Sequence, residues 1–287
     1  MNAASRITAA VTLATALLSP SGARAQDITD RFWETRAWVG EVTFLGVNSL
    51  VAGITAGIIQ ELRDGSFQQG FAKGALGGAI AYGGRRLAVE DFDGAGLLGR
   101  QIGAAGASMT RNAGEGVPLL SRLQFPVGPI TFDVLTGAEK RVTPRVNLLA
   151  AGWIVRALLD DRMQFDGRSS LSAGVPVFNA PDYIIGAEGG VAGGATFPGL
   201  ILIGHDLNPG SDTFVHERAH VAQMDFAQII WGDPVERWAT ERIFGSPRLL
   251  QYIQPGVLVP LLYGASIQVI RYEDRPWEIE ASFLEQR

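Results

Sequence analysis

The sequence contains no cysteine among its 287 residues, and it has only three histidines. Disulfides and thiol catalysis are therefore excluded, and nitrogen and oxygen ligands must hold any metal. Charged residues are scarce, at 18%, and no run of lysine or arginine occurs. A formal net charge of −5 leaves no basic surface to collect phosphates, so nucleic acid is not an expected partner. Apolar residues make up 47% of the chain, which is enough for a substantial core.

The first 25 residues have the pattern of a signal peptide. Arg6 supplies a positive charge, residues 7–18 form an uncharged apolar run, and Ala23-Arg24-Ala25 is a small-x-small cleavage site. An apolar run of this length spans roughly 18 Å as a helix, which is shorter than a hydrocarbon core of ~30 Å. The sequence therefore predicts an exported protein that is periplasmic, envelope-associated or secreted, with a mature chain that begins at Gln26.

Residues 26–115 are rich in glycine and are predicted to form a helical module. Residues 42–59 carry no charge and reach the lower limit of length for a membrane span. Two interpretations stay open: a module that associates with or inserts into a membrane, and a compact helical hairpin in which glycine permits close packing. Small residues recur at every fourth position, a spacing that lets helices approach closely and predicts three tightly packed helices; they are Gly53 and Gly57, then Gly70, Gly74 and Gly78, and then Gly99, Gly103 and Ala107.

Residues 116–287 are predicted to form a β region followed by helices, so the expected fold class is α+β. Short apolar runs between proline, glycine and asparagine are typical of strands and turns, and short connections favour a mostly antiparallel arrangement. A glycine-rich loop is expected at residues 186–199. The predicted strands are residues 130–135, 145–149, 153–158, 175–178 and 200–203. The predicted helices are residues 213–230, 235–244 and 277–284, with a bent helical pair at residues 249–270.

The segment His216-Glu217-Arg218-Ala219-His220 has the pattern of a metal site within a predicted helix. Two histidines four residues apart lie on one face of a helix, so both imidazoles can bind one ion. Glu217 can reach a water on that metal and act as a general base without being a ligand. A surface helix with a chance pair of histidines is the alternative.

A catalytic zinc ion typically has three protein ligands and one open position. The third ligand is therefore His205, the remaining histidine, or a carboxylate, and residues 273–281 place several carboxylates at the start of a downstream helix. The C-terminal third resembles the gluzincin-type zinc metallopeptidases, in which an HExxH helix precedes a helix that carries a glutamate ligand. In one branch of that class the second helix reads Glu-x-x-Ala-Asp. Glu278-Ile279-Glu280-Ala281-Ser282 matches at the first glutamate and the alanine and departs at the aspartate.

The resemblance implies a zincin-like C-terminal part in which His216, His220 and Glu278 bind zinc, with Glu280 as the alternative third ligand. A zinc site of this kind lowers the pKa of a bound water and polarises a carbonyl, with Glu217 as the general base. Tyr263, Arg271 and Tyr272 lie in the part of the chain where an oxyanion donor is needed.

The expected activity is that of an exported zinc endopeptidase that acts on a peptide or protein substrate. An extended peptide is expected to pair with the strand at residues 200–203, if that strand forms a sheet edge. Two other hypotheses stay open. One is an envelope-associated structural or binding protein with a relict or structural metal site, and the other is a zinc hydrolase that acts on other substrates.

Overall fold

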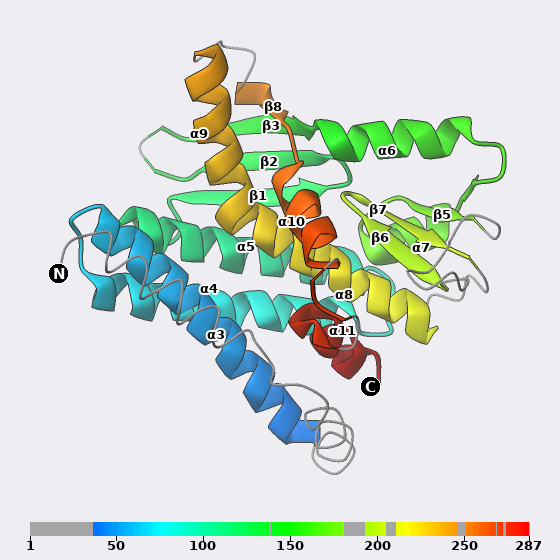
Figure 1. Ribbon diagram of the computed structural model, residues 1–287, viewed down its shortest axis with the longest axis horizontal. Coiled ribbons are helices and arrows are strands. Elements are labelled where there is room, and N and C mark those ends of the chain that lie inside the picture. Colours follow the sequence, from blue (N-terminus) through cyan, green and yellow to red (C-terminus); the bar gives the residue numbers. More distant parts are fainter. Residues whose placement is uncertain are drawn as a thin grey trace.

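The structure is a computed structural model that describes residues 37–137, 139–180, 193–204, 211–245, 251–267, 269–271 and 274–286. These residues form long helices and two small sheets, which confirms the α+β class predicted from the sequence (Figure 1). The predicted signal peptide, residues 1–25, lies outside the described residues.

The glycine-rich part forms three long helices, α3 (Ala37–Leu62), α4 (Phe67–Ala88) and α5 (Ala95–Glu115), which pack side by side (Figure 1). A Cβ added at Gly74 would lie 2.7 Å from the carbonyl oxygen of Ala52, and one at Gly84 would lie 2.2 Å from the amide nitrogen of Gly103. Backbones that approach this closely leave no room for a side chain. The prediction of three tightly packed helices from the spacing of small residues is therefore confirmed.

The first sheet has the strand order β1-β2-β3-β8, and its strand β1 packs against α5. The hairpins β1–β2 and β2–β3 are antiparallel, whereas β8 pairs with β3 in parallel. The predicted strand at residues 130–135 coincides with β2. The strands are β1 (Arg122–Val127), β2 (Ile130–Leu135), β3 (Arg141–Asn147) and β8 (Ile253–Gln254).

The second sheet has the order β4-β5-β7-β6, so β7 is an inner strand and β6 lies at the edge. The prediction that residues 200–203 form a sheet edge is therefore wrong, although they do form the strand β7. Residues 194–197 of the predicted glycine-rich loop form the edge strand instead. The strands are β4 (Gln164–Phe165), β5 (Val177–Asn179), β6 (Gly194–Phe197) and β7 (Leu200–Ile203), and the short helix α7 (Gly167–Ala173) precedes β5.

The prediction of a strand at residues 153–158 is wrong, because this segment belongs to the helix α6 (Leu148–Leu159). The Asn147 side chain accepts a hydrogen bond from the amide of Ala150 at 3.0 Å and caps the helix. Leucine and alanine, both strong helix formers, fill most of the following turn. A short apolar run alone does not distinguish a strand from a helix, and here the cap was the deciding signal.

After β7 the chain is mainly helical. The helix α8 (Asp212–Ala227) continues through a π-helical turn, η1 (Gln228–Gly232), directly into α9 (Asp233–Phe244). Pro234, which cannot donate a backbone hydrogen bond, lies in the first turn of α9, directly after the π-helical turn. The last helix, α11 (Pro276–Glu285), covers the helix predicted at residues 277–284.

The bent helical pair predicted at residues 249–270 is wrong in its first half. In the part of this segment that the structure describes, residues 251–252 form a 3₁₀ turn, the short strand β8 follows, and α10 (Leu258–Ile267) is the α-helix. Gly256 has a φ of +72°, a left-handed conformation that ends the strand before α10 begins. Pro255 precedes it and, because proline is poorly tolerated inside a helix, separates the two elements.

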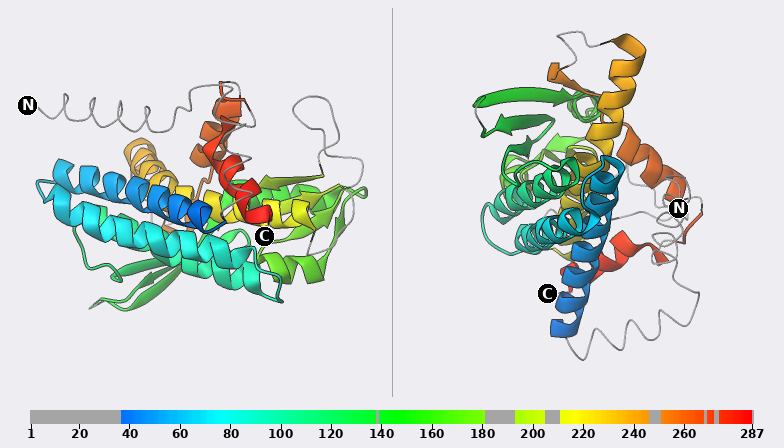
Figure 2. Two further views of the ribbon diagram at one scale, coloured as in Figure 1. Left: turned by 90° about the horizontal axis from the view of Figure 1, so that it is seen from below. Right: turned by 90° about the vertical axis from the view of Figure 1, so that its left-hand side faces the viewer.

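The helix α8 packs against the glycine-rich helices, α11 and the second sheet (Figures 1 and 2). The glycine-rich helices therefore share a hydrophobic core with the helix that carries the histidine motif. One buried cluster joins α3, α4, α8 and α11 through Phe44, Tyr82, Ala219, Ala281 and Phe283. A second cluster joins α8 to the second sheet through Val177, Ile201, Ile203, Phe214 and Val221.

A buried charge cluster ties α5, β3 and α9 together. Asp233, at the start of α9, is fully buried, and Arg111 Nη1 donates to its Oδ2 at 2.6 Å while Arg145 Nη1 donates to its Oδ1. Burial by itself raises the pKa of Asp233, but the two arginines outweigh burial and hold its pKa well below the ordinary value. The ionised carboxylate is therefore part of the folded state.

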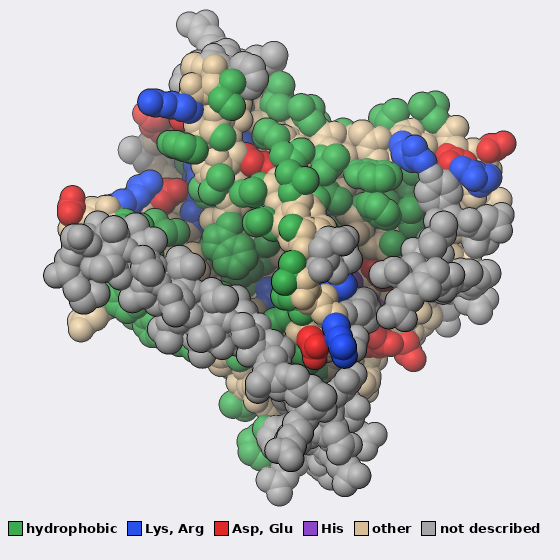
Figure 3. Space-filling view, viewed as in Figure 1, with side chains coloured by type: hydrophobic (Ala, Val, Ile, Leu, Met, Phe, Trp, Pro, Cys, Tyr) green, Lys and Arg blue, Asp and Glu red, His purple; other side chains and the backbone are tan. Residues whose placement is uncertain are grey.

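By length and composition alone, α3 could cross a membrane over residues 38–62, the one such helix in the described part of the chain. Large apolar side chains are also exposed on α6 and α10, among them Leu158, Leu159, Leu261 and Leu262. Figure 3 shows hydrophobic side chains gathered on the face that carries α9 and α10. Both interpretations of the glycine-rich module, membrane-associated and compact, are compatible with these features.

Candidate metal centre

The two motif histidines lie one turn apart on α8 and face the same point. Their Nε2 atoms are 2.9 Å apart, and both side chains are buried. The helix begins at a proper cap, because Ser211 Oγ accepts a hydrogen bond from the amide of Phe214. The local sequence therefore places both imidazoles on the same face of α8.

Glu278 reaches the same point from α11. Its Oε2 lies 3.2 Å from His216 Nε2 and 3.1 Å from His220 Nε2, and the residue is 2% exposed. Three ligands at the corners of a tetrahedron with bonds of about 2.0–2.1 Å lie about 3.3 Å apart. The three observed separations are close to that value, so the group could hold one metal ion.

The outer nitrogens of both rings meet acceptor oxygens. His216 Nδ1 lies 2.9 Å from Glu285 Oε2, and His220 Nδ1 lies 2.8 Å from the side-chain oxygen of Gln223. Each neutral ring therefore carries its proton on Nδ1, which leaves a lone pair on Nε2. Two lone pairs and a carboxylate oxygen then converge, an arrangement that repels itself unless a cation lies among them.

The electrostatics of His216 agree with this arrangement. Burial by itself lowers the pKa of His216, but hydrogen bonds to Glu278 and Glu285 outweigh it and raise the pKa to about 10. The surroundings of the ring therefore favour positive charge at this position, whether a proton or a metal ion supplies it.

Glu217 follows His216 directly on α8 and is 7% exposed. Thr196 Oγ1, on the edge strand β6, donates a hydrogen bond to Glu217 Oε2 at 2.6 Å. Burial raises the pKa of Glu217, while His220 and the Thr196 hydrogen bond lower it. The edge strand therefore fixes the orientation of this carboxylate.

Tyr263 contacts a member of the group, whereas Glu280 lies outside it. The Tyr263 hydroxyl, on α10, donates to Glu278 Oε1 at 2.9 Å. Glu280, the alternative third ligand, is instead bonded to Arg85, whose Nε lies 3.2 Å from Glu280 Oε1. Among the other sequence candidates, Arg271 is exposed, and His205 and Tyr272 lie outside the described residues.

Sequence reasoning missed three side chains that contact the centre: Thr196, Gln223 and Glu285. Glu285 follows Glu278 by seven residues, which is two helical turns, so its position was a detectable signal. The aspartate absent at Ser282 would follow Glu278 by four residues, and Glu285 offers a carboxylate one turn further on. Gln223 follows His220 by three residues, again on one helical face.

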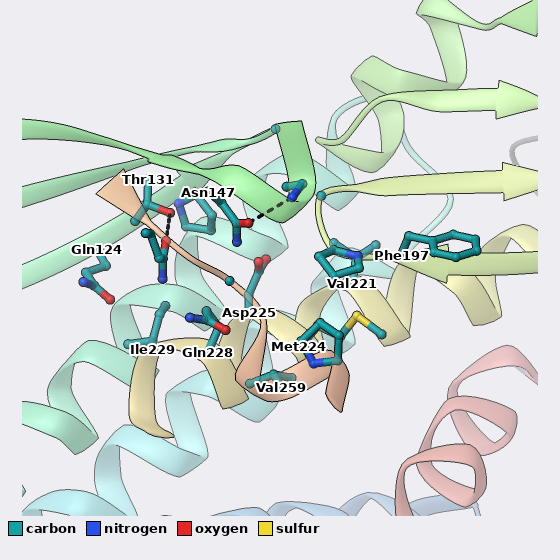
Figure 4. A pocket seen from close by; sticks show the side chains of 18 residues that line it. Gln124, Thr131, Asn147, Phe197, Val221, Met224, Asp225, Gln228, Ile229 and Val259 are labelled. Carbon is teal, nitrogen blue, oxygen red and sulfur yellow. Dashed lines mark hydrogen bonds between the residues drawn. The ribbon is translucent and has the colours of Figure 1, made fainter. Parts of the chain in front are cut away.

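A cavity of about 50 Å³ lies beside α8 but does not contain the metal cluster (Figure 4). Val221 and Met224 of α8 and Gln228 of η1 line it on one side, and Phe197 at the end of β6 lines it together with Pro198 and Gly199 of the following turn. A volume of this size accommodates a few water molecules. The cavity lies on the face of α8 that carries Glu217, since residues 217, 221 and 224 share one face of this helix.

The chain was compared with protein-family models, with curated proteins and with solved structures, and no match was found in any of the three comparisons.

Proposed function

We propose that this chain is an exported zinc-dependent hydrolase that cleaves peptide bonds. The observation that carries the proposal is the convergence of His216 Nε2, His220 Nε2 and Glu278 Oε2 at separations of 2.9–3.2 Å. Two imidazoles and one carboxylate are a ligand set used by catalytic zinc, and three protein ligands leave a fourth position open. The packing of α11 against α8 supports a zincin-like C-terminal part.

The ligand chemistry favours zinc over harder cations. Magnesium and calcium take oxygen ligands, whereas two of the three donors here are imidazole nitrogens. The contacts of the outer ring nitrogens with Glu285 and Gln223 orient both imidazoles, as carboxylates and carbonyl groups commonly do for histidines that bind zinc.

Zinc in such a site supplies a nucleophilic water at neutral pH and polarises the carbonyl of the scissile bond. Glu217 would take a proton from the attacking water at Oε1, because Thr196 holds Oε2, and would then donate that proton to the leaving amine. Tyr263 holds Glu278 by a hydrogen bond to its Oε1. The chain thus contributes a general base, a group that orients it and a group that orients the carboxylate ligand.

The edge strand β6 supports a peptide as the substrate. Its outer edge carries no partner strand in the described sheet, while its Thr196 side chain touches Glu217. An extended peptide that adds to this edge through backbone hydrogen bonds would run past the general base. The strand proposed to pair with a peptide is therefore β6, at residues 194–197, in place of residues 200–203.

A structural metal site in an envelope protein is the second candidate. The observation in its favour is the deep burial of the ligands, of which Glu278 is only 2% exposed. Structural zinc sites are closed, with four protein ligands and no position for water or substrate. A zinc hydrolase that acts on other substrates shares the predicted metal centre and differs only in the bond cleaved.

The test is a pair of measurements on the mature chain and on Glu217→Gln. A peptidase predicts one zinc per chain in both proteins, cleavage of a denatured protein substrate by the wild type, and a loss of activity of at least 10²-fold in the variant. A structural site predicts zinc in both proteins and no cleavage by either. A hydrolase of another class predicts zinc in both and activity that appears only with ester or non-peptide amide substrates.

A further inference from the structure

The side-chain amide of Gln223 has only one orientation that satisfies its neighbours. Its Nε2 lies 2.8 Å from Glu280 Oε2 and 3.0 Å from the carbonyl oxygen of Trp277, and both of these atoms can only accept. The Gln223 oxygen must therefore be the atom that faces His220 Nδ1 at 2.8 Å. This oxygen accepts the Nδ1 proton, which leaves the Nε2 lone pair of His220 directed at Glu278 and His216.

Glu280 is in turn held by the glycine-rich helices. Asn48, on α3, donates to Glu280 Oε1 at 3.0 Å, and Arg85, on α4, donates to the same atom at 3.2 Å. Arg85 also donates to the Asn48 side-chain oxygen, and its guanidinium lies over the ring of Phe226 on α8. Arg85 and Glu280 are 2% and 6% exposed, so this ion pair is shielded from water.

We propose that Arg85 and Glu280 are positioning residues for the metal centre, acting on His220 through Gln223. The inference rests on the proposed zinc site. It assigns the glycine-rich helices α3 and α4 a role in orienting one of the metal ligands. Without the Glu280 carboxylate, the carbonyl oxygen of Trp277 is the one acceptor left among the described residues to hold the Gln223 amide. An amide that rotates presents a donor to His220, which reverses the tautomer of the ring and removes the lone pair from Nε2. The helices α3 and α4 thereby set the metal affinity of a ligand more than 130 residues away in sequence.

The closest available control is the ion pair between Arg100, on α5, and Asp225, on α8. It resembles the first pair in chemistry and in the burial of its arginine, since Arg100 is 2% exposed and its Nε lies 2.6 Å from Asp225 Oδ2, although the Asp225 side chain is 18% exposed against 8% for Glu280. It also joins a glycine-rich helix to α8, but it contacts no histidine in the described structure. A difference between the two pairs therefore isolates the link to His220 from general packing.

The experiment replaces both members of each pair by methionine. Removing a whole buried ion pair is often close to neutral for stability, whereas removing one partner leaves an uncompensated charge. The variants are Arg85→Met with Glu280→Met, and Arg100→Met with Asp225→Met. Zinc affinity is measured by competition with a chromophoric chelator, and thermal unfolding of the metal-free proteins checks that each variant folds.

The Arg85 and Glu280 double variant is expected to bind zinc about 10- to 100-fold more weakly than the wild type. The Arg100 and Asp225 variant is expected to stay within about twofold. Equal affinities in all three proteins, or equal losses in both variants, would overturn the inference while leaving the zinc site intact. Failure of the wild type to bind zinc would instead refute the proposed function.

A second measurement does not require the metal, and it stays informative if a double variant unfolds. The single variant Gln223→Met removes the amide while nearly conserving its size, and ¹⁵N shifts of the imidazole report which ring nitrogen carries the proton. In the metal-free wild type at a pH where His220 is neutral, the proton is expected on Nδ1. In the variant a mixture of both tautomers is expected, and an unchanged Nδ1 proton would overturn the inference.

Discussion

Removing the hydroxyl of Thr196 tests the role of Glu217 without touching a metal ligand. In Thr196→Val the side chain keeps its shape, but Glu217 Oε2 loses a hydrogen bond of 2.6 Å inside a buried site. A hydrogen bond to a charged group contributes about 1.5–3 kcal/mol. Because this bond favours the ionised carboxylate, its loss raises the pKa of Glu217 and favours the protonated form by roughly ten- to a hundredfold.

The assay is the pH dependence of kcat/KM for a peptide substrate. A general base must be ionised to act, so the acidic limb of the profile should move by about one to two pH units toward higher pH in Thr196→Val. Thr196→Ser is the matched control, because serine keeps the hydroxyl and loses only a methyl group, and its limb should stay near that of the wild type. An acidic limb that does not move in the valine variant, or moves equally in both, would refute the reasoning.

Three further predictions concern other parts of the chain. Asp233→Asn removes the fully buried carboxylate that Arg111 and Arg145 share and leaves them only the more peripheral Glu115 and Asp133, so it should lower the free energy of unfolding by about 3 kcal/mol in urea titrations. Because the folded pKa of Asp233 is depressed, the wild type should lose this stabilisation progressively as pH falls below about 4. Gly84→Ala should destabilise by about 1–3 kcal/mol through its backbone clash, while Gly83→Ala, with nothing within 4 Å, should stabilise by about 0.5–1 kcal/mol in thermal unfolding. Mass spectrometry of the protein exported from a bacterial host should find Gln26 at the N-terminus, and retention of residues 1–25 would contradict the predicted signal peptide.

The helical part of the fold was predictable because its signals are local. Small residues at every fourth position mark the contact face of α4 at Gly70, Gly74 and Gly78, whatever those helices pack against. The strand predicted at residues 153–158 is a helix because a short apolar run suits both structures equally well, and the signal for the helix is the cap at Asn147. Strand order was not predictable, since the parallel pairing of β5 with β7 depends on partners distant in sequence.

The candidate site likewise combines residues with a local sequence pattern, which were predictable, and contacts between distant segments, which were not. His216, Glu217 and His220 form one local pattern, and the gluzincin resemblance pointed to Glu278. The contact of Thr196 with Glu217 and that of Arg85 with Glu280 join segments far apart in the chain, and neither pair leaves a periodic pattern in the sequence. Because the chain has no cysteine, a third protein ligand must be a histidine or a carboxylate.

The most direct test of the zinc site is metal content together with X-ray absorption of the purified mature chain, beside Glu278→Ala and Glu280→Ala. A catalytic zinc site predicts one zinc per wild-type chain, with two imidazole nitrogens, one carboxylate oxygen and one water oxygen around it. It also predicts loss of zinc in Glu278→Ala, and retention of zinc with lower affinity in Glu280→Ala. A wild-type chain without zinc, or zinc that stays bound with unchanged ligands in Glu278→Ala, would contradict the proposed metal centre.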